Sequence, residues 1–273
     1  MKIAVFTGAS SGMGREFVKQ ITAEQKFDEV WVIARRLDRL EEIKSEVNCF
    51  VRCIPLDLTK KQAWDEYKAL LEEYNPEVKV LVNASGYGKF GAFCDLPLDE
   101  QLGMIDLNDK ALVAITYITL PYLISGSEVY QVDSFSSFQP VPYIGVYGAT
   151  KAFVLSFTRA VNSEMRHTGV KMMAVCPGWV KPEFFDRAVI DESVITYYNQ
   201  FFTAEQVVKC ALRDMKKKKD VSVCGFKIRA QVLLTKLLPH RLVMKIWLKQ
   251  QGKKLTLGKI KVGRGKPSRV KYI

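Results

Sequence analysis

Seven short apolar runs recur along the chain, and the segments between them are long enough to hold a helix. Strands that are buried on both faces of a parallel sheet have this continuous apolar character, and parallel neighbours need a crossover connection. The alternation therefore predicts an α/β fold, with a doubly wound parallel sheet. The runs span residues 2 to 7, 29 to 34, 49 to 54, 78 to 84, 128 to 134, 171 to 176 and 221 to 224.

The length of 273 residues suits one such unit, and no internal repeat or linker divides it. The six cysteines and two histidines lack the spacing of a disulfide framework or a metal site, so we expect reduced thiols and no metal. The first run begins almost at Met1, which leaves no room for a signal peptide, and no apolar stretch approaches the roughly 20 residues of a membrane span. We expect a cytoplasmic protein.

A glycine-rich loop joins the first apolar run to a segment with helical spacing. It reads Thr7-Gly8-Ala9-Ser10-Ser11-Gly12-Met13-Gly14. Gly8 permits a tight turn, Gly12 lets the backbone approach a pyrophosphate, and Gly14 allows close contact between helix and strand. The helix dipole favours the phosphate charge. Alone, the spacing equally suits an ordinary turn, but in this position it predicts a nucleotide site in a Rossmann-like sheet.

Tyr147 and Lys151 lie four residues apart in a helical segment, and therefore on one face of the helix. An ammonium beside the phenol favours its ionised form, which matters because a free phenol has a pKa near 10. This spacing by itself is common on solvated helices. Together with the upstream glycine loop, it predicts an enzyme of hydride transfer, with the phenol as the proton donor or acceptor.

With these two motifs, the chain resembles the short-chain dehydrogenase/reductase family from Met1 to about Leu248. Other family positions are matched in order, and Ser134 lies thirteen residues before Tyr147, at the family's spacing. The remaining matches are Asp57 in Pro55-Leu56-Asp57-Leu58, Asn83 and Gly86 in Asn83-Ala84-Ser85-Gly86, Asn108 in Ile105-Asp106-Leu107-Asn108, and Pro177-Gly178 after Val175-Cys176.

The resemblance implies a catalytic group made of Asn108, Ser134, Tyr147 and Lys151. Tyr147 would exchange the proton, Ser134 would position the substrate oxygen, and Lys151 would also hold the nicotinamide ribose. Asn108 would hold a water that connects Lys151 to solvent. The cofactor contacts implied by the family are Gly8, Ser10, Ser11, Gly12, Met13, Gly14, Asp57, Asn83, Gly86, Tyr147, Lys151, Pro177, Gly178 and Val180.

The chain departs from the family pattern in two places. Ala84 and Ser85 stand where the family usually has Asn and Ala, which removes one side chain that supports the backbone near the cofactor ribose. After Gly178 the chain reads Trp179-Val180-Lys181-Pro182, whereas the family has a threonine at the last position that contacts the nicotinamide carboxamide. We expect a backbone group or Lys181 to make that contact, or the nicotinamide to be held less firmly.

The end of the second run reads Ile33-Ala34-Arg35-Arg36, where NAD-specific relatives tend to place an acid. An acid would repel a 2′-phosphate, whereas an arginine can bind it through charge-assisted hydrogen bonds. We therefore predict a preference for NADP(H) over NAD(H), through Arg35 with help from Ser10 and Arg36. The alternative is a solvated arginine pair at the end of a strand.

The net charge of +12 is divided unevenly along the chain. Residues 209 to 273 contain 20 lysines and arginines and only two aspartates, a balance of +18, whereas the preceding residues have a balance of −6. Two helices are expected in this basic part, from Arg229 to Leu238 and from Arg241 to Gln251, separated by Pro239. We predict a catalytic domain at 1–225, an amphipathic helical extension at 226–251 and a flexible basic tail at 252–273.

The second of these helices is apolar over most of its surface, and its apolar side must be buried somewhere. Its own domain, a partner subunit, a lid over the substrate and a bilayer surface are all open at this stage. We predict attraction to anionic membranes, with insertion of Leu242, Ile246 and Trp247. The competing arrangement is a homodimer or homotetramer, since the family commonly forms such assemblies.

In this family the segment after Pro177-Gly178 selects the substrate, and here, within 179–204, it is rich in aromatic residues. We expect about half of them to pack structurally and the others to line a pocket for a bulky hydrophobic ketone or alcohol, such as a steroid, bile acid or lipid. An idle nucleotide-binding scaffold or sensor at a membrane is the alternative, and nucleic-acid binding is not expected. The aromatic residues are Trp179, Phe184, Phe185, Tyr197, Tyr198, Phe201 and Phe202.

Overall fold

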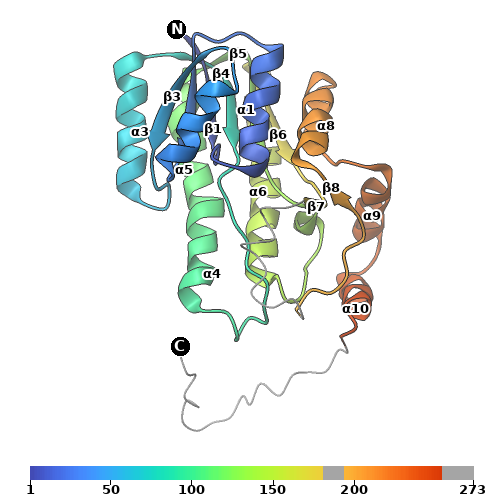
Figure 1. Ribbon diagram of the computed structural model, residues 1–273. Coiled ribbons are helices and arrows are strands. Elements are labelled where there is room, and N and C mark those ends of the chain that lie inside the picture. Colours follow the sequence, from blue (N-terminus) through green and yellow to red (C-terminus); the bar gives the residue numbers. More distant parts are fainter. Residues whose placement is uncertain (181–193, 254–273) are drawn as a thin grey trace.

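A seven-stranded parallel sheet forms the centre of the molecule in the computed structural model, which describes residues 1–180 and 194–253 (Figure 1). The strand order is β3-β2-β1-β4-β5-β6-β9, so the direction of winding reverses between β1 and β4. The strands are β1 (Lys2–Thr7), β2 (Glu29–Ala34), β3 (Phe50–Pro55), β4 (Glu77–Asn83), β5 (Leu123–Val132), β6 (Lys171–Val175) and β9 (Val221–Ser222). Every predicted apolar run overlaps one of these strands, and the predicted fold class is confirmed.

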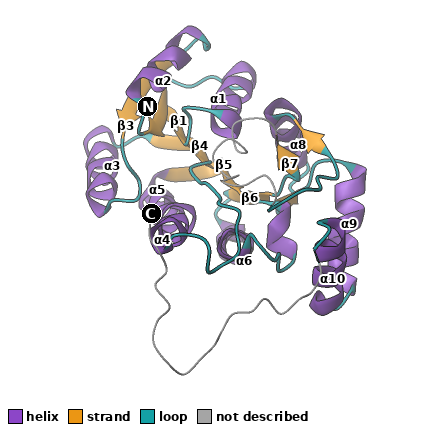
Figure 2. Cartoon of the chain, turned by 60° about the horizontal axis from the view of Figure 1, so that its bottom comes forward, coloured by secondary structure: helices purple, strands orange, loops and turns teal. Residues whose placement is uncertain are grey.

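Helices cover both faces of the sheet (Figure 2). The longer ones are α1 (Gly12–Glu24), α2 (Leu37–Glu41), α3 (Lys61–Tyr74), α4 (Leu98–Ile105), α5 (Leu112–Thr119), α6 (Gly145–Glu164), α8 (Ala204–Lys216), α9 (Phe226–Leu237) and α10 (His240–Gln250). Short helical turns are η1 (Glu42–Ser45), η2 (Asp106–Ala111), η3 (Leu120–Tyr122), η4 (Phe135–Phe138) and η5 (Met165–His167). A separate two-stranded parallel ladder joins β7 (Trp179–Val180) to β8 (Phe201–Phe202).

Successive residues of each central strand contribute to opposite faces, which gives two core layers. On one face Phe6 packs with Phe17 of α1, and the layer includes residues of α2, α8 and α9. On the other face Val5 packs in a layer with Tyr67 of α3 and Ile115 of α5. Full burial of each large apolar side chain contributes about 1.5 to 3 kcal/mol, so the strands are apolar on both faces because both are covered.

The carboxyl ends of the strands all lie at one edge of the sheet because the strands are parallel. This edge carries the glycine loop after β1, Arg35 and Arg36 after β2, and Ser134 after β5. In doubly wound sheets the ligand site lies at this edge, near the reversal of strand order. The positions predicted from the sequence are therefore brought to one side of the molecule.

The two expected C-terminal helices are present as α9 and α10, and Pro239 separates them. Ile228 and Val232 of α9 are buried in the main core beside Phe202. Among the described helices, none combines the length and apolar character needed to cross a membrane. Residues 254–273, which include most of the predicted basic tail, lie outside the described part of the chain.

Candidate active site

The loop between β1 and α1 has the backbone geometry that its glycines were expected to provide. Gly8 and Gly12 have positive φ angles of 68° and 53°. A Cβ on Gly8 would lie 2.7 Å from the Ala84 carbonyl, and a Cβ on Gly14 would lie 2.3 Å from the Gly8 carbonyl oxygen. Larger residues cannot replace these glycines without moving backbone, so the loop leaves an open cradle of the kind that holds a dinucleotide pyrophosphate.

Thr7, the last residue of β1, supports the backbone where the sequence departs from the family motif. Its buried hydroxyl oxygen accepts hydrogen bonds of 3.2 Å from the amides of Ala84 and Ser85. Asn83 turns away from this loop, because its side-chain amide donates to the Thr116 hydroxyl of α5 at 3.0 Å. Thr7 therefore supports the backbone of this segment whatever side chains stand at positions 84 and 85.

The two arginines after β2 lie differently. Arg36 donates to the Ser10 hydroxyl across 3.3 Å, which links the end of β2 to the glycine loop. Arg35 is exposed. Arg15 of α1, by contrast, is held in ion pairs of 2.8 Å with Glu42 and 2.6 Å with Glu46. Arg35 and Arg36, unlike Arg15, form no ion pair with a carboxylate among the described residues.

Asp57 uses one carboxylate oxygen to hold its own turn, accepting hydrogen bonds from the amide and the hydroxyl of Thr59 at 3.1 and 2.8 Å. The turn fixes the chain directly after β3, at the same edge of the sheet as the glycine loop. Asp57 is half-buried there.

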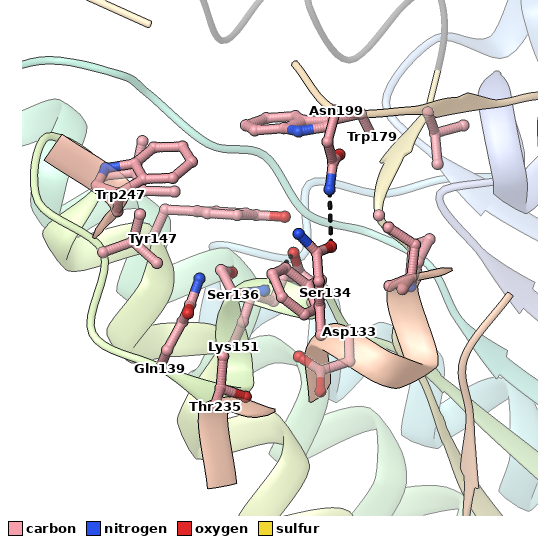
Figure 3. A pocket seen from close by; sticks show the side chains of 18 of the residues that line it. Asp133, Ser134, Ser136, Gln139, Tyr147, Lys151, Trp179, Asn199, Thr235 and Trp247 are labelled. Atoms are coloured by element: carbon pink, nitrogen blue, oxygen red, sulfur yellow. Dashed lines mark hydrogen bonds between the residues drawn. The ribbon is translucent and has the colours of Figure 1, made fainter. Parts of the chain in front are cut away.

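Ser134, Tyr147 and Lys151 meet at the floor of a cavity (Figure 3). Tyr147 and Lys151 are buried on one face of α6, and the Lys151 Nζ lies 5.8 Å from the centre of the Tyr147 ring. The Lys151 ammonium donates to the Val132 carbonyl at 2.9 Å. Burial raises the pKa of the Tyr147 phenol, and a hydrogen bond with Ser134 opposes that rise. The pKa decrease that the sequence led us to expect from Lys151 is thus not the dominant influence on this phenol.

Asn108 lies in a π-helical turn, η2, between α4 and α5, and such turns are frequent at functional sites. Its side-chain amide donates to the Tyr87 carbonyl at 2.9 Å and to the Thr150 hydroxyl at 3.0 Å. The Thr150 hydroxyl in turn donates to the Tyr147 carbonyl at 2.8 Å. Asn108 is therefore joined to α6, the helix of Tyr147 and Lys151.

Gly86 explains how closely these groups approach. A Cβ at this position would lie 2.9 Å from the Asn108 Oδ1 and 3.7 Å from the Lys151 Nζ. A side chain at this position would therefore push the Asn108 amide from its present place.

The cavity has a volume of about 430 Å³ and joins the glycine loop to the catalytic group. Gly12 and Met13 line one end, and Pro177, Gly178 and Val180 line it after β6. Most of the remaining wall is apolar. It includes Phe90, Val141, Ile144, Trp179, Ile228, Leu234, Leu238, Val243, Ile246 and Trp247.

The C-terminal helices form one wall of this cavity, so part of their apolar surface is buried against the protein's own catalytic site. Trp247 stacks on Trp179 with ring centres 6.4 Å apart, and its indole N–H donates to the Pro142 carbonyl at 3.1 Å. The sequence-based expectation that Trp247 inserts into a bilayer is therefore wrong, because the indole faces the cavity. Leu242 and Ile246 are each 43 % exposed, and Ile246 also lines the cavity.

The predicted aromatic segment divides between pocket and core. Trp179 and Tyr197 line the cavity, whereas Phe202 is buried in the main core. Tyr198 packs against Trp179 at 4.9 Å and against Phe201 at 5.4 Å. The expectations for Phe184, Phe185, Lys181 and Pro182 fall outside the described residues.

Several polar cavity residues were missed by sequence reasoning. Ser136 is buried in the cavity wall, and its hydroxyl has no hydrogen-bond partner among the described residues. Asn199 donates to Gln231 of α9 at 2.7 Å (Figure 3). Asp133 lies on the cavity floor beside Ser134. No motif marks these positions, and only the adjacency of Asp133 and Ser136 to Ser134 could have drawn attention to them.

Comparison with known proteins identifies the family of this chain. The sequence pattern of the short chain dehydrogenases matches residues 2–193. An uncharacterised oxidoreductase of Staphylococcus epidermidis is 32% identical over 182 residues, covering 66% of this chain and 78% of that protein.

Two solved structures share the fold. A short-chain dehydrogenase from Sphingobium yanoikuyae in complex with NADPH has a TM-score of 0.75 at 22% identity, covering 89% of this chain and 95% of its own. The bulky-bulky ketone specific alcohol dehydrogenase from Comamonas testosteroni has a TM-score of 0.69 at 22% identity, covering 87% and 92%. The protein belongs to the short-chain dehydrogenase/reductase family and is an NAD(P)-dependent oxidoreductase.

Proposed function

We propose that the protein is an NADPH-preferring carbonyl reductase or hydroxy dehydrogenase that acts on a bulky hydrophobic ketone or alcohol. The observation that carries this proposal is the single cavity that joins the glycine loop, the Ser134–Tyr147–Lys151 group and a wall of apolar side chains. A steroid, a bile acid or a lipid-like ketone matches such a wall because apolar burial supplies the affinity. The fold is shared with a ketone-specific alcohol dehydrogenase, which supports this substrate class.

The residues of the site have distinct roles in this proposal. The nicotinamide, when bound, supplies or accepts the hydride. The Tyr147 hydroxyl exchanges a proton with the substrate oxygen, and the Ser134 hydroxyl orients that oxygen. Lys151 holds positive charge beside the phenol, and Asn108 fixes η2 against α6 so that the proton path to Lys151 stays in place. The glycine loop would hold the pyrophosphate at the beginning of α1.

The proton role is tested with Tyr147→Phe, which keeps the ring and removes the hydroxyl. We expect loss of NADPH-dependent turnover with unchanged NADPH binding, measured by cofactor consumption and by fluorescence titration. Tyr117→Phe is the matched control, since Tyr117 is 75 % exposed and lies on α5. Substantial activity in Tyr147→Phe would assign the proton transfer to another group. Steroids, bile acids, 3-oxoacyl compounds and simple ketones form the substrate panel.

Cofactor preference follows from the two arginines after β2. An arginine hydrogen bond to a charged group contributes about 1.5 to 3 kcal/mol, so loss of the arginine that binds a 2′-phosphate should weaken NADPH binding by about 10- to 100-fold. We expect this loss in Arg36→Ala, Arg35→Ala or their combination, with NADH affinity unchanged. Arg39→Ala is the control, because Arg39 is exposed and pairs with Glu42. Equal affinity of the unaltered protein for NADPH and NADH would refute the preference.

We also propose that the outer face of α9 brings the enzyme to anionic membrane surfaces. Phe226, Leu233 and Leu237 share this face and are 85, 60 and 71 % exposed. The exposed cations Lys227 and Lys236 also belong to α9. Arg241, Lys245 and Lys249 are exposed on α10 and add to this positive charge. Each suitably placed cation adds about 1 kcal/mol near an acidic leaflet, and partly inserted apolar side chains add to it.

Vesicle cosedimentation tests the surface proposal. We expect binding to vesicles that contain phosphatidylserine, little binding to phosphatidylcholine alone, and loss of binding in high salt and in Leu233→Ser/Leu237→Ser. Phe93→Ser is the control, since Phe93 is about as exposed as the leucines but lies between β4 and α4, outside α9. If the double variant instead converts an oligomer to a monomer in light scattering, the face is a subunit contact and the membrane proposal fails.

A further inference from the structure

A buried carboxylate lies on the cavity floor, one residue before Ser134. The Asp133 side chain is 2 % exposed, and its Oδ2 accepts a hydrogen bond from the Cys176 thiol at 3.2 Å. Its Oδ1 makes no hydrogen bond of standard geometry within the described part of the chain, although the Ser137 hydroxyl and the Ser134 backbone approach the carboxylate and lower its pKa. Buried polar atoms are almost always paired, so an acid that only stabilised the fold would be expected to have both oxygens satisfied.

Lys151 is the cation that lines the cavity together with this acid. The lysine is 5 % exposed, and its ammonium has one hydrogen bond among the described residues, to the Val132 carbonyl directly before Asp133. Burial lowers the pKa of Lys151, and the negative charge of Asp133 is the largest influence that opposes this decrease. Lys151 in turn lowers the pKa of Asp133, which burial raises to about 7.

A second acid approaches Lys151 from a different element. Asp109 follows Asn108 in η2, and its Oδ1 is also buried without a hydrogen-bond partner among the described residues. Burial raises the pKa of Asp109 to about 7, and the Lys151 charge opposes the rise. The close approach of Asn108 and Lys151 around Gly86 places η2 beside the ammonium.

The titratable groups that influence Lys151 therefore come from four different elements. They are Asp133 after β5, Asp109 in η2, Cys176 after β6 and Tyr147 on α6. Only the two acids carry the opposite charge. Removing one partner of a buried charge pair leaves the other uncompensated, which favours its neutral form.

We propose that Asp133 is a positioning residue that keeps Lys151 cationic and fixed below Tyr147, with Asp109 supporting the same charge from η2. The proposal rests on the catalytic roles given above for Tyr147 and Lys151. In this proposal Asp133 does not bind the substrate oxygen. It acts through Lys151, whose positive charge its own negative charge stabilises. Its negative charge also raises the pKa of Tyr147, which keeps the phenol protonated for ketone reduction.

The first test needs neither cofactor nor turnover. The full chain is enriched with ¹³C at the lysine ε-carbons, and the Lys151 signal is identified by its loss in Lys151→Arg. In Asp133→Asn we expect the Lys151 titration midpoint to fall by about one pH unit or more, and in Asp109→Asn by a smaller amount. Asp133→Ser is the second variant, in case the asparagine protein does not fold.

Asp214→Asn is the matched control. Asp214 is a buried acid of α8 that is held by Lys219 at 2.8 Å and Ser222 at 2.9 Å, with no contact to the catalytic group. It should lose stability and leave the Lys151 midpoint unchanged. An unchanged midpoint in a folded Asp133 variant, or an equal shift in Asp214→Asn, would overturn the proposal.

The second test is the pH profile of ketone reduction. Asp133→Asn should move the alkaline limb to lower pH, because both Lys151 and Tyr147 then lose their protons at lower pH. If the Lys151 midpoint moves and the alkaline limb of the pH profile does not, the charge coupling between Asp133 and Lys151 exists but Lys151 does not control turnover. That result would contradict the catalytic role proposed for Lys151.

Discussion

Replacement of Gln251 by alanine should weaken the attachment of the C-terminal helices to the loop that carries Tyr197. Gln251 follows α10 and is 2 % exposed. Its Oε1 accepts from the amides of Thr196 at 2.8 Å and Tyr197 at 3.0 Å, and its Nε2 donates to the Tyr197 carbonyl at 3.1 Å. One side chain thus satisfies three backbone groups of a segment 54 residues or more away.

The loss can be estimated from these three groups. A partly buried group that loses its partner costs about 1 kcal/mol or more, and the low end applies because Thr196 and Tyr197 are otherwise exposed to water. We expect the free energy of unfolding of Gln251→Ala to fall by about 2 to 3 kcal/mol in urea. Gln251→Glu keeps an acceptor for both amides but turns a carboxylate oxygen toward the Tyr197 carbonyl at a buried position, so it should recover only part of the loss.

Lys249→Ala is the control, since Lys249 is exposed on the same helix and should change stability by less than about 0.5 kcal/mol. Gln251→Ala should also raise the KM for a bulky ketone more than that for a small one, because the cavity wall carried by α10 becomes mobile. A stability and a KM equal to those of Lys249→Ala would refute the reasoning.

Three further outcomes are expected. Gly14→Ala forces a Cβ to 2.3 Å from the Gly8 carbonyl oxygen and should abolish NADPH binding in a fluorescence titration while far-UV circular dichroism still reports a folded protein. Thr7→Val leaves the amides of residues 84 and 85 without their hydroxyl acceptor and should lower stability in urea by about 1 to 3 kcal/mol, with Thr7→Ser close to the unaltered protein. Burial raises the pKa of Asp109 to about 7, so the folded state binds more protons than the unfolded state between about pH 4 and 7. Stability should therefore fall as pH rises through that window, and Asp109→Asn should flatten the dependence in urea titrations at several pH values.

The sheet could be predicted closely because a strand that is buried on both faces must be apolar along its whole length. The run at 29–34 coincides with β2, and the run at 2–7 coincides with β1. The run at 128–134 begins five residues after the start of β5, since the first part of that strand contains exposed and polar residues such as Ser125 and Gly126. The apolar pattern of the sequence detects the buried part of a strand and misses the part that is exposed to solvent.

The orientation of α10 could not be predicted for a related reason. The helix is amphipathic, but its pattern shows only that one side is apolar and not whether that side meets the cavity, a subunit or a bilayer, so the direction of Trp247 depended on tertiary contacts. The same limit applies to the site. The spacing of Ser134, Tyr147 and Lys151 suffices to place them near one another, but the burial that raises the pKa of Tyr147 depends on the surrounding walls.

The wall formed by α10 also has a consequence for the order in which the protein matures. The hydrogen bond from Trp247 to Pro142 spans 105 residues of sequence, whereas the sheet from β1 to β5 is complete before residue 133. Contacts between distant residues close late, and during synthesis the amino-terminal part emerges first. The nascent protein should therefore pass through a stage in which the sheet exists and Phe90 and Trp179 line an open apolar hollow. At that stage the most apolar surface is exposed, so chaperone binding and aggregation should both be strongest then.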